Sequence, residues 1–284
     1  MLDSSFHLDA KSISRLSSSG LGLDAMKRQV NDDLTLFIEL WHAQGLKLTK
    51  HQGYFYFDTK FIPMDKAEFC IVDIETNGSK YDKHQIIEIA AVKVKNGVIT
   101  DRFESLVKCS EINEHITLIT GIKVEDTLSA PTMKQVLYDF KKFLGDTVFV
   151  AHDIKFDYKF ISAMLTRVGL APLLNRGLCS LALAERTVVS YRYALSYLND
   201  SLNLNPHATH HRAMSDVMTT YGLFKLSLEN ITENINNIED LIRFSKEAKR
   251  LKRPKFDPMR ESQEEMCEEV QEEENLKKKK ESSE

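Results

Sequence analysis

The sequence predicts an α/β fold in which helices flank a mixed central sheet, with a small α/β appendage at the N-terminus. Residues 85–108 alternate as two strands joined at Asn96-Gly97, which is a strong hairpin signal. Further along, the short apolar strand 147–152 is followed by amphipathic helices that alternate with another strand. A strand meander followed by alternating strands and helices indicates one mixed sheet covered by helices.

Length and composition fit a globular protein. The 284 residues, 42% of them hydrophobic, suffice for one sizeable core with appended pieces. No apolar run approaches the roughly 20 residues that a membrane span needs, and the N-terminus lacks the regions of an export signal. Four cysteines without a CxxC pair indicate reduced thiols: Cys70, Cys109, Cys179 and Cys267. We therefore expect a cytoplasmic protein without membrane contact.

Changes in composition divide the chain into four expected segments. They are an N-terminal appendage with a helix and a β-hairpin (1–66), a main domain (67–230), a basic helical extension (231–260) and an acidic tail (261–284). The tail has ten acidic residues, four lysines and few bulky apolar side chains, so we expect it to be disordered. The basic block before it could follow phosphates, face the acidic tail or form a solvated helix surface, and the last two interpretations together are favoured.

In the appendage, Asp32 or Asp33 can cap a helix that Gly45 ends. The apolar residues of this helix recur at helical spacing: Leu34, Phe37, Ile38 and Trp41. The residues after it alternate as a hairpin around Gln52-Gly53. A helix followed by a basic, aromatic hairpin resembles the end of a winged-helix module. The pattern fits a packing role at least as well as a nucleic-acid contact.

The helices of the main domain can be placed from capping and spacing. Pro131 fits the first turn of an amphipathic helix that ends near Gly145. Residues 156–170 form a second helix, residues 177–188 a strand that runs into a helix, and residues 211–231 a long final helix. We expect these helices to cover the sheet.

The stretch FCIVDIETNG, residues 69–78, begins as a buried strand that Asp73 and Glu75 interrupt. Side chains two residues apart project from the same side of a strand, so the two carboxylates lie together. They repel each other and resist leaving water unless a positive group compensates them. The strand therefore predicts a positively charged partner.

Three further residues could complete such a site. Asp157 follows the carboxyl end of the strand 147–152, where functional groups gather in open α/β sheets. His211 and Asp216 are five residues apart, so on one helix they would lie roughly 140° apart. If both serve one site, His211 lies on the loop or first turn, and Asp216 faces inward from the helix. This predicts a mobile histidine beside a fixed carboxylate.

Four carboxylates without a matching Lys or Arg in their motifs indicate hard divalent cations. Oxygen ligands suit Mg²⁺ or Mn²⁺, whereas Zn²⁺ prefers His and Cys. Two such ions about 4 Å apart can activate a water and stabilise the leaving oxygen of a phosphodiester, and a nearby histidine can take the proton. His207 and His211, at i and i+4, leave zinc as a lesser alternative because no third ligand is evident.

The motifs DIET, AHDIKFD and HRAMSDV resemble, in order and spacing, those of the DnaQ-like exonucleases with an Asp-Glu-Asp-Asp-His set. The resemblance covers about residues 67–228 and is nearest to the proofreading (epsilon-type) subunits of bacterial DNA polymerase III. It implies a ribonuclease H-like fold and 3′→5′ hydrolysis of nucleic acid with two Mg²⁺ ions, for which Mn²⁺ can substitute. It also implies His211 as the general base and four metal ligands: Asp73, Glu75, Asp157 and Asp216.

Other positions are informative beside these motifs. The sister subclass has Tyr where Arg212 stands, so the His subclass is indicated. The resemblance implies that Thr76 contacts the terminal nucleotide of the substrate and that His152 supports the site from behind. Asp153 replaces the family's usual Asn, and it either adds a negative charge near the site or points away. Residues 135–140 come nearest to a clamp-binding motif but fall within a predicted helix, where core packing is the favoured interpretation.

The resemblance implies a 3′→5′ exonuclease that acts on single-stranded or frayed DNA 3′ ends and proofreads for a DNA polymerase III catalytic subunit. A ribonuclease that trims RNA 3′ ends shares these motifs, so the fold alone does not decide between them. A non-catalytic module that scaffolds a polymerase is a third alternative, and the intact set of acids argues against it. Phe156, Tyr158 and Phe160 could form a base-stacking row, but a helix core is favoured.

Overall fold

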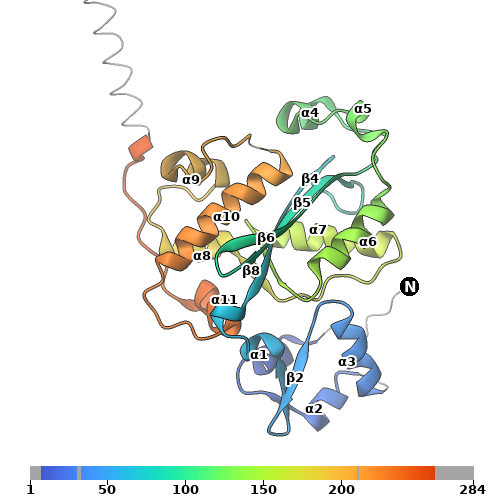
Figure 1. The fold of residues 1–284 in the computed structure, drawn as a ribbon, viewed down its shortest axis with the longest axis vertical. Coiled ribbons are helices and arrows are strands. Elements are labelled where there is room, and N and C mark those ends of the chain that lie inside the picture. Colours follow the sequence, from blue (N-terminus) through green and yellow to red (C-terminus); the bar gives the residue numbers. More distant parts are fainter. Residues whose placement is uncertain (1–7, 31–32, 210, 260–284) are drawn as a thin grey trace, which may run out of the picture.

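The computed structural model describes residues 8–30, 33–209 and 211–259, and its main domain is built on the expected mixed sheet (Figure 1). Five strands lie in the order β6-β5-β4-β7-β8. Their bounds are β4 Glu68–Thr76, β5 Ile86–Lys95, β6 Val98–Leu106, β7 Val148–Ala151 and β8 Gly177–Cys179. β4 is antiparallel to β5 and parallel to β7, so the sheet is mixed as predicted. The hairpin from β5 to β6 turns at Asn96 and Gly97, which both have positive φ (51° and 70°).

Helices cover both faces of the sheet. The principal ones are α6 Met133–Leu144, α7 Ile154–Arg167, α8 Ser180–Thr187, α10 Ala213–Glu229 and α11 Ile238–Glu247. Shorter helices are α4 Glu114–Thr120, α5 Val124–Thr127 and α9 Leu195–Leu202, with 3₁₀ turns at Asp58–Lys60 and Met64–Lys66. The helices predicted from residues 156, 177 and 211 are therefore present as α7, α8 and α10.

The alternation of β4 sends its side chains into two separate cores. Cys70 and Ile74 pack with α6 and α7 on one face. Phe69 packs on the other face, with α8, α10 and α11. Because the side-chain period of a strand is two, Asp73 and Glu75 continue the face of Phe69 and point toward α10.

The start of α6 differs from the expectation. The Thr132 side chain accepts a hydrogen bond from the Gln135 amide and caps the helix, so Pro131 stands before the cap. The placement of Pro131 in the first turn is therefore wrong, because the hydroxyl of Thr132, the next residue, caps the helix and α6 begins only at Met133. Residues 135–140 lie within α6, and Val136 and Phe140 are buried in the core.

The N-terminal part of the chain contains more than the predicted helix and hairpin. Helix α3 (Leu34–His42) is capped by Asp33, and the hairpin of β2 (Leu48–His51) and β3 (Tyr54–Phe57) turns at Gln52-Gly53. Three elements precede them: α1 Ala10–Ser17, β1 Leu21–Gly22 and α2 Leu23–Lys27. The strands pair in the order β1-β3-β2. The resemblance to a winged-helix module stays a prediction. We call residues 8–57 the N-terminal module.

A buried ion pair between the β8 region and α11 also contacts the end of the N-terminal module. Arg176 Nε and Nη2 donate to the two Glu239 oxygens, each at 2.7 Å, and Glu239 is 4% exposed. Thr59 Oγ1, just after β3, donates to Glu239 Oε1 at 2.6 Å, and the Arg176 guanidinium lies 4.2 Å from the centre of the Phe57 ring. Contacts from three segments therefore meet at one carboxylate.

The basic extension, 231–260, is helical in its middle, from Ile238 to Glu247, and not in residues 231–237. Helix α11 ends at Glu247, and the residues that follow run in extended form across α8. Arg250 and Arg253 both pair with the buried carboxylate of Glu185, at 3.1 Å each. The prediction of a helical basic block is wrong beyond Glu247 because these pairs, and Pro254, hold the chain in an extended conformation. The acidic tail, 261–284, lies outside the described residues.

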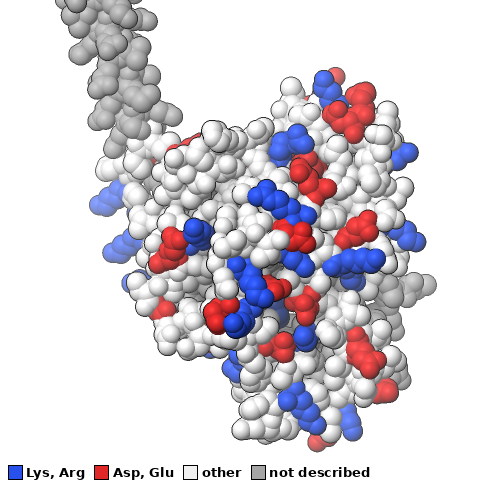
Figure 2. Space-filling model, viewed as in Figure 1, with Lys and Arg blue, Asp and Glu red and all other residues white. Residues whose placement is uncertain are grey.

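The surface and the thiols agree with the expectations from composition. Figure 2 shows basic and acidic side chains interspersed over the face in view, without an extended region of one sign. Cys70, Cys109 and Cys179 are free thiols, and Cys267 lies outside the described residues. Within the described ranges, no helix is both long and apolar enough to span a membrane.

Candidate active site

The site begins where β4 extends beyond its neighbour β7. The register pairs Ile71 with Val150, so β7 ends at Ala151 while β4 continues to Thr76. The extension holds the DIET motif. Asp73 and Glu75 project from it toward α10, and the pairing with β5 shifts between Glu75 and Thr76. The carboxylates therefore occupy the carboxyl end of a central strand, with helices arriving on either side.

Asp157 reaches this end of β4 from the first turn of α7. Asp153 adopts a left-handed conformation (φ 60°) that turns the chain sharply from β7 into the helix. The Asp157 side chain is 4% exposed, and the Ile74 backbone amide hydrogen-bonds to it. Asp157 therefore lies beside the peptide between Asp73 and Glu75.

His211 and Asp216 arrive on the other side. His211 lies on the loop with φ 61°, and α10 begins at Ala213 with Asp216 in its first turn. The predicted separation of loop histidine and helix carboxylate is therefore present. The His211 backbone amide donates to Asp216 Oδ2 at 3.1 Å. One ligand atom from each of Glu75, His211 and Asp216 lies within 4.8 Å of the other two.

The electrostatics show that the carboxylates gather at one point. Burial, and then the charges of Asp157 and Asp216, raise the pKa of Asp73 well above its usual range. Burial, and then the charge of Asp216, raise the pKa of Glu75 to about 8. Burial also raises the pKa of Asp157 to about 8. Without a bound cation, the protein must therefore hold several of these groups protonated near neutral pH.

The residues present fit hard divalent cations. Beside burial, the charges of Asp157 and Asp216 raise the pKa of both Asp73 and Glu75, and a bound cation would relieve this repulsion. Oxygen-rich ligand sets suit Mg²⁺ or Mn²⁺. Among the described residues, the His/Cys/Asp/Glu group suited to a metal contains Glu75, His211 and Asp216, and His207 is not part of it. Zinc held by His207 and His211 therefore has no support.

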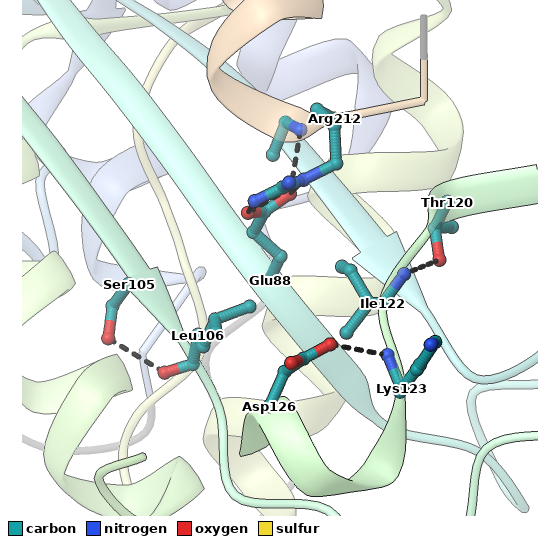
Figure 3. A network of polar contacts seen from close by, with 9 residues as sticks. Glu88, Ser105, Leu106, Thr120, Ile122, Lys123, Asp126 and Arg212 are labelled. Carbon is teal, nitrogen blue, oxygen red and sulfur yellow. Dashed lines mark hydrogen bonds and ion pairs between the residues drawn. The ribbon is translucent and has the colours of Figure 1, made fainter. Parts of the chain in front are cut away.

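Glu88 is a site neighbour that motif reasoning missed. It lies on β5 directly opposite Glu75 and is 1% exposed. Its carboxylate pairs with Arg212, whose Nη2 lies 2.7 Å from Glu88 Oε1 (Figure 3). The signal in the sequence was a single acid in the otherwise apolar run IIEIAAV, which resembles the interruption at Asp73.

The secondary residues occupy different positions. Both ring nitrogens of His152 are engaged, Nε2 with the Tyr193 carbonyl at 2.8 Å and Nδ1 with Ser180 Oγ at 3.1 Å. Burial lowers the pKa of His152, so the neutral ring is favoured. This geometry fits a supporting role better than direct contact with a substrate. Thr76 ends β4 and is partly exposed, and Asp153 is exposed.

The aromatic row does not form a stacking surface. Phe160 is 1% exposed and belongs to the core, and Tyr158 donates its hydroxyl hydrogen to the Asn175 carbonyl at 3.0 Å. Phe156 is 41% exposed and packs against Phe160 with ring centres 5.5 Å apart. The core interpretation is therefore confirmed for Phe160 and, in part, for Tyr158, whereas Phe156 lies at the surface.

Comparison with known proteins agrees with the geometry. Residues 70–224 match the exonuclease family RNase_T. The chain is 33% identical over 181 residues to DNA polymerase III PolC-type of Staphylococcus haemolyticus, a match that covers 63% of this chain and 12% of that protein. It is 32% identical over 198 residues to DNA polymerase III PolC-type of Thermotoga petrophila, covering 66% and 14%. The chain thus spans only a small part of the length of these relatives.

A solved structure shares the fold. Escherichia coli exonuclease I in complex with a dT13 oligonucleotide superimposes with a TM-score of 0.53 at 16% identity, over 58% of this chain and 41% of that one. The apo form of exonuclease I gives a TM-score of 0.51 at 16% identity, over 58% and 42%. The main domain therefore has the ribonuclease H-like fold of these exonucleases.

Proposed function

The chain belongs to the RNase_T exonuclease family, and from this membership we propose that it is a metal-dependent 3′→5′ exonuclease acting on DNA ends. The observation that carries the proposal is the convergence of carboxylates from β4, α7 and α10 beside the loop histidine His211. Acids that only stabilised the fold would not be placed where their charges repel one another. A site for cations and a phosphodiester explains them.

Each side chain has a proposed role. Asp73, Glu75, Asp157 and Asp216 would hold two Mg²⁺ ions, which Mn²⁺ could replace. When bound, such ions lower the pKa of a water and neutralise charge on the phosphodiester. His211, on its loop beside Glu75 and Asp216, accepts the proton of that water.

Hydrolysis of the terminal phosphodiester releases a nucleoside 5′-monophosphate and leaves a shortened strand with a new 3′ hydroxyl. Thr76, at the exposed end of β4, contacts the terminal nucleotide in this proposal. The two hydrogen bonds of His152 connect the Tyr193 carbonyl with Ser180 at the start of α8. In this proposal His152 supports the site indirectly, without contacting the substrate.

A proofreading role in replication follows from the relatives. Both PolC-type relatives named above are DNA polymerase III proteins. The residues that match the exonuclease family, 70–224, include the carboxylate motifs. We therefore propose single-stranded or frayed DNA 3′ ends as the substrate, a replicative polymerase catalytic subunit as the partner and the cytoplasm as the location.

A cleavage assay on matched oligonucleotides tests the proposal. Paired DNA, mismatched DNA and RNA 3′ ends are compared with Mg²⁺ and with chelator. We expect Mg²⁺-dependent release of mononucleotides, fastest from mismatched or single-stranded DNA ends. Faster trimming of RNA would support the ribonuclease alternative. Cleavage that survives chelation would overturn the metal mechanism, and no cleavage of any end would favour the scaffolding role.

A further inference from the structure

Glu88 is a fifth carboxylate next to the site, and its position makes it costly. It faces Glu75 across the β4–β5 ladder and is 1% exposed. Its charge contributes to the raised pKa values of both Asp73 and Glu75. A buried acid that repels two neighbouring acids needs strong compensation to be tolerated.

Among the described residues, the start of α10 supplies the hydrogen bonds and the positive charge that compensate Glu88. Arg212 Nη2 donates to Glu88 Oε1 at 2.7 Å, and Arg212 Nε lies 3.2 and 3.3 Å from the two oxygens. The Ala213 backbone amide donates to Glu88 Oε2 at 2.9 Å. Figure 3 shows the Glu88 side chain rising from β5 to meet Arg212 below the first turn of the helix.

Glu88 therefore acts as the cap of a helix to which it does not belong. Arg212 is the N-cap residue of α10, and its side chain makes no hydrogen bond to the amides of the first turn. The first-turn amide of Ala213 is satisfied instead from the neighbouring strand. A carboxylate at a helix N-terminus is also favoured by the helix dipole.

Arg212, which Glu88 holds in this way, lies in the sequence between His211 and Asp216, two residues of the site. His211 precedes Arg212 and has φ 61°, a conformation that a non-glycine residue keeps only when its surroundings fix it. Asp216 follows in the first turn, where its amide donates to the Arg212 carbonyl at 3.0 Å. Moving residue 212 would therefore move the histidine and the carboxylate together.

We propose that Glu88 and Arg212 form a positioning pair that fixes the start of α10, so that His211 and Asp216 face Glu75. This inference rests on the proposed function. The Glu88 oxygens are occupied by Arg212 and Ala213, so the pair acts through the position of α10 in this inference. The fork of an arginine is required because it holds the carboxylate at two points, which the single ammonium of a lysine cannot do.

The test compares Glu88→Gln, Arg212→Gln, Arg212→Lys and the double variant Glu88→Gln/Arg212→Gln in the full chain. Cleavage of a single-stranded DNA oligonucleotide gives kcat and KM, and electron paramagnetic resonance gives the Mn²⁺ affinity. We expect each glutamine variant to lose about 10- to 100-fold in kcat or in Mn²⁺ affinity, the usual effect of residues that orient metal ligands, with KM for DNA little changed. We expect the double variant to lose little more than either single one, and Arg212→Lys to recover part of the loss.

The pair of Arg176 and Glu239 is a matched control. It has the same residue types and the same 2.7 Å contact, but it joins α11 to the strand β8 region, away from the site. Glu239→Gln should lower the melting temperature without reducing kcat below the transition. If it reduced kcat as much as Glu88→Gln does, the effect would reflect general loss of stability and the inference would be overturned.

The outcomes separate this inference from the proposed function. Wild-type cleavage with unchanged kcat and Mn²⁺ affinity in the Glu88 and Arg212 variants would overturn the positioning role alone. A wild-type chain that cleaves no end would overturn the exonuclease proposal, and the Mn²⁺ affinities would still decide the role of the pair. If Glu88→Gln fails to fold, Arg212→Lys, which keeps the charge, carries the comparison against Arg176→Lys.

Discussion

At the scale of single residues, the free-energy cost of ionising each carboxylate of the site depends on the charges of the others. Asp73 and Glu75 share one face of β4, Asp157 accepts a hydrogen bond from the Ile74 amide between them, and Asp216 faces them from α10. Ionising one group makes the next ionisation harder, which is why burial and mutual charge raise the pKa of Asp73 and of Glu75. Removing one carboxylate should therefore stabilise the metal-free protein and at the same time weaken the catalytic site.

His211→Ala tests the proposed general base. We expect kcat to fall by about 10²- to 10⁴-fold, the usual contribution of a positioned base, because no other group would accept the proton of the attacking water. The melting temperature should change little since the side chain lies on an exposed loop. Rates on a single-stranded oligonucleotide provide the measurement. His207→Ala, an exposed histidine of the same loop, should keep the wild-type rate; equal rates in both variants would exclude the role of His211.

Asp157→Asn separates stability from activity. The amide can still accept the Ile74 hydrogen bond, and it folds without taking up a proton. Asp157, whose pKa burial raises to about 8, is ionised in the unfolded chain near neutral pH and must bind a proton on folding. We expect the metal-free variant to melt at a higher temperature than the wild type at neutral pH, while Mg²⁺-dependent cleavage is lost. Calorimetry and the cleavage assay measure the two effects. Asp153→Asn, on an exposed residue with φ 60°, should change neither by much, and a fully active Asp157→Asn would contradict the ligand role.

At the scale of elements, the sequence pattern predicted those helices, strands and turns that depend mainly on residues close in sequence. The alternation of residues 85–108, the turn at Asn96-Gly97 and the cap at Asp33 were readable because each depends on neighbours in sequence. Helix α1 was missed because a serine-rich stretch has weak helical propensity; it is stabilised by the burial of Leu16 in the core that contains Trp41. The pairing of Glu88 with Arg212, 124 positions apart, depends on strand register and could not be read from the sequence.

Glu239→Ala tests the junction of α11, β8 and the N-terminal module. Removing one partner of a buried ion pair should destabilise the protein by about 3–5 kcal/mol, because Arg176 is left without its carboxylate. Thr59 loses its acceptor as well. Denaturant unfolding measures the change. The control is Glu68→Ala, whose partner Lys95 lies at 2.7 Å in an exposed pair and should contribute no more than about 1 kcal/mol. Equal losses of unfolding free energy in the two variants would show that the buried ion pair stabilises the protein no more than the exposed one does.

At the scale of the whole molecule, the N-terminal module and the site occupy opposite ends of β4. The module connects through residues 58–67 to Glu68, and the site begins at Asp73, so the strand separates them by about 17 Å. Helix α3 contains no Lys or Arg, and its exposed face presents Leu36 and Leu40. The charge pattern of this helix therefore favours the packing interpretation of the module over a nucleic-acid contact.

The proposed cation site should also affect the stability of the whole protein, through its dependence on pH and on Mg²⁺. A carboxyl whose pKa is raised in the folded protein binds protons more tightly than it does in the unfolded chain. Stability of the metal-free protein therefore falls as the pH rises from the ordinary carboxyl pKa, about 4, toward the folded value of about 8 for Glu75. Bound Mg²⁺ replaces the protons as counter-charge, so its stabilising effect should grow over the same pH range.

Thermal unfolding with Mg²⁺ and with chelator, near pH 5 and about pH 8, measures this coupling. We expect the rise in melting temperature caused by Mg²⁺ to be small at the lower pH and large at the higher one, because protons and cations compete for the same oxygens. Asp73→Asn should reduce both the pH dependence and the Mg²⁺ effect, since it removes a carboxylate from the centre of the cluster. An Mg²⁺ effect that is equal at both pH values, or larger at the lower one, would show that these carboxylates do not bind the ion.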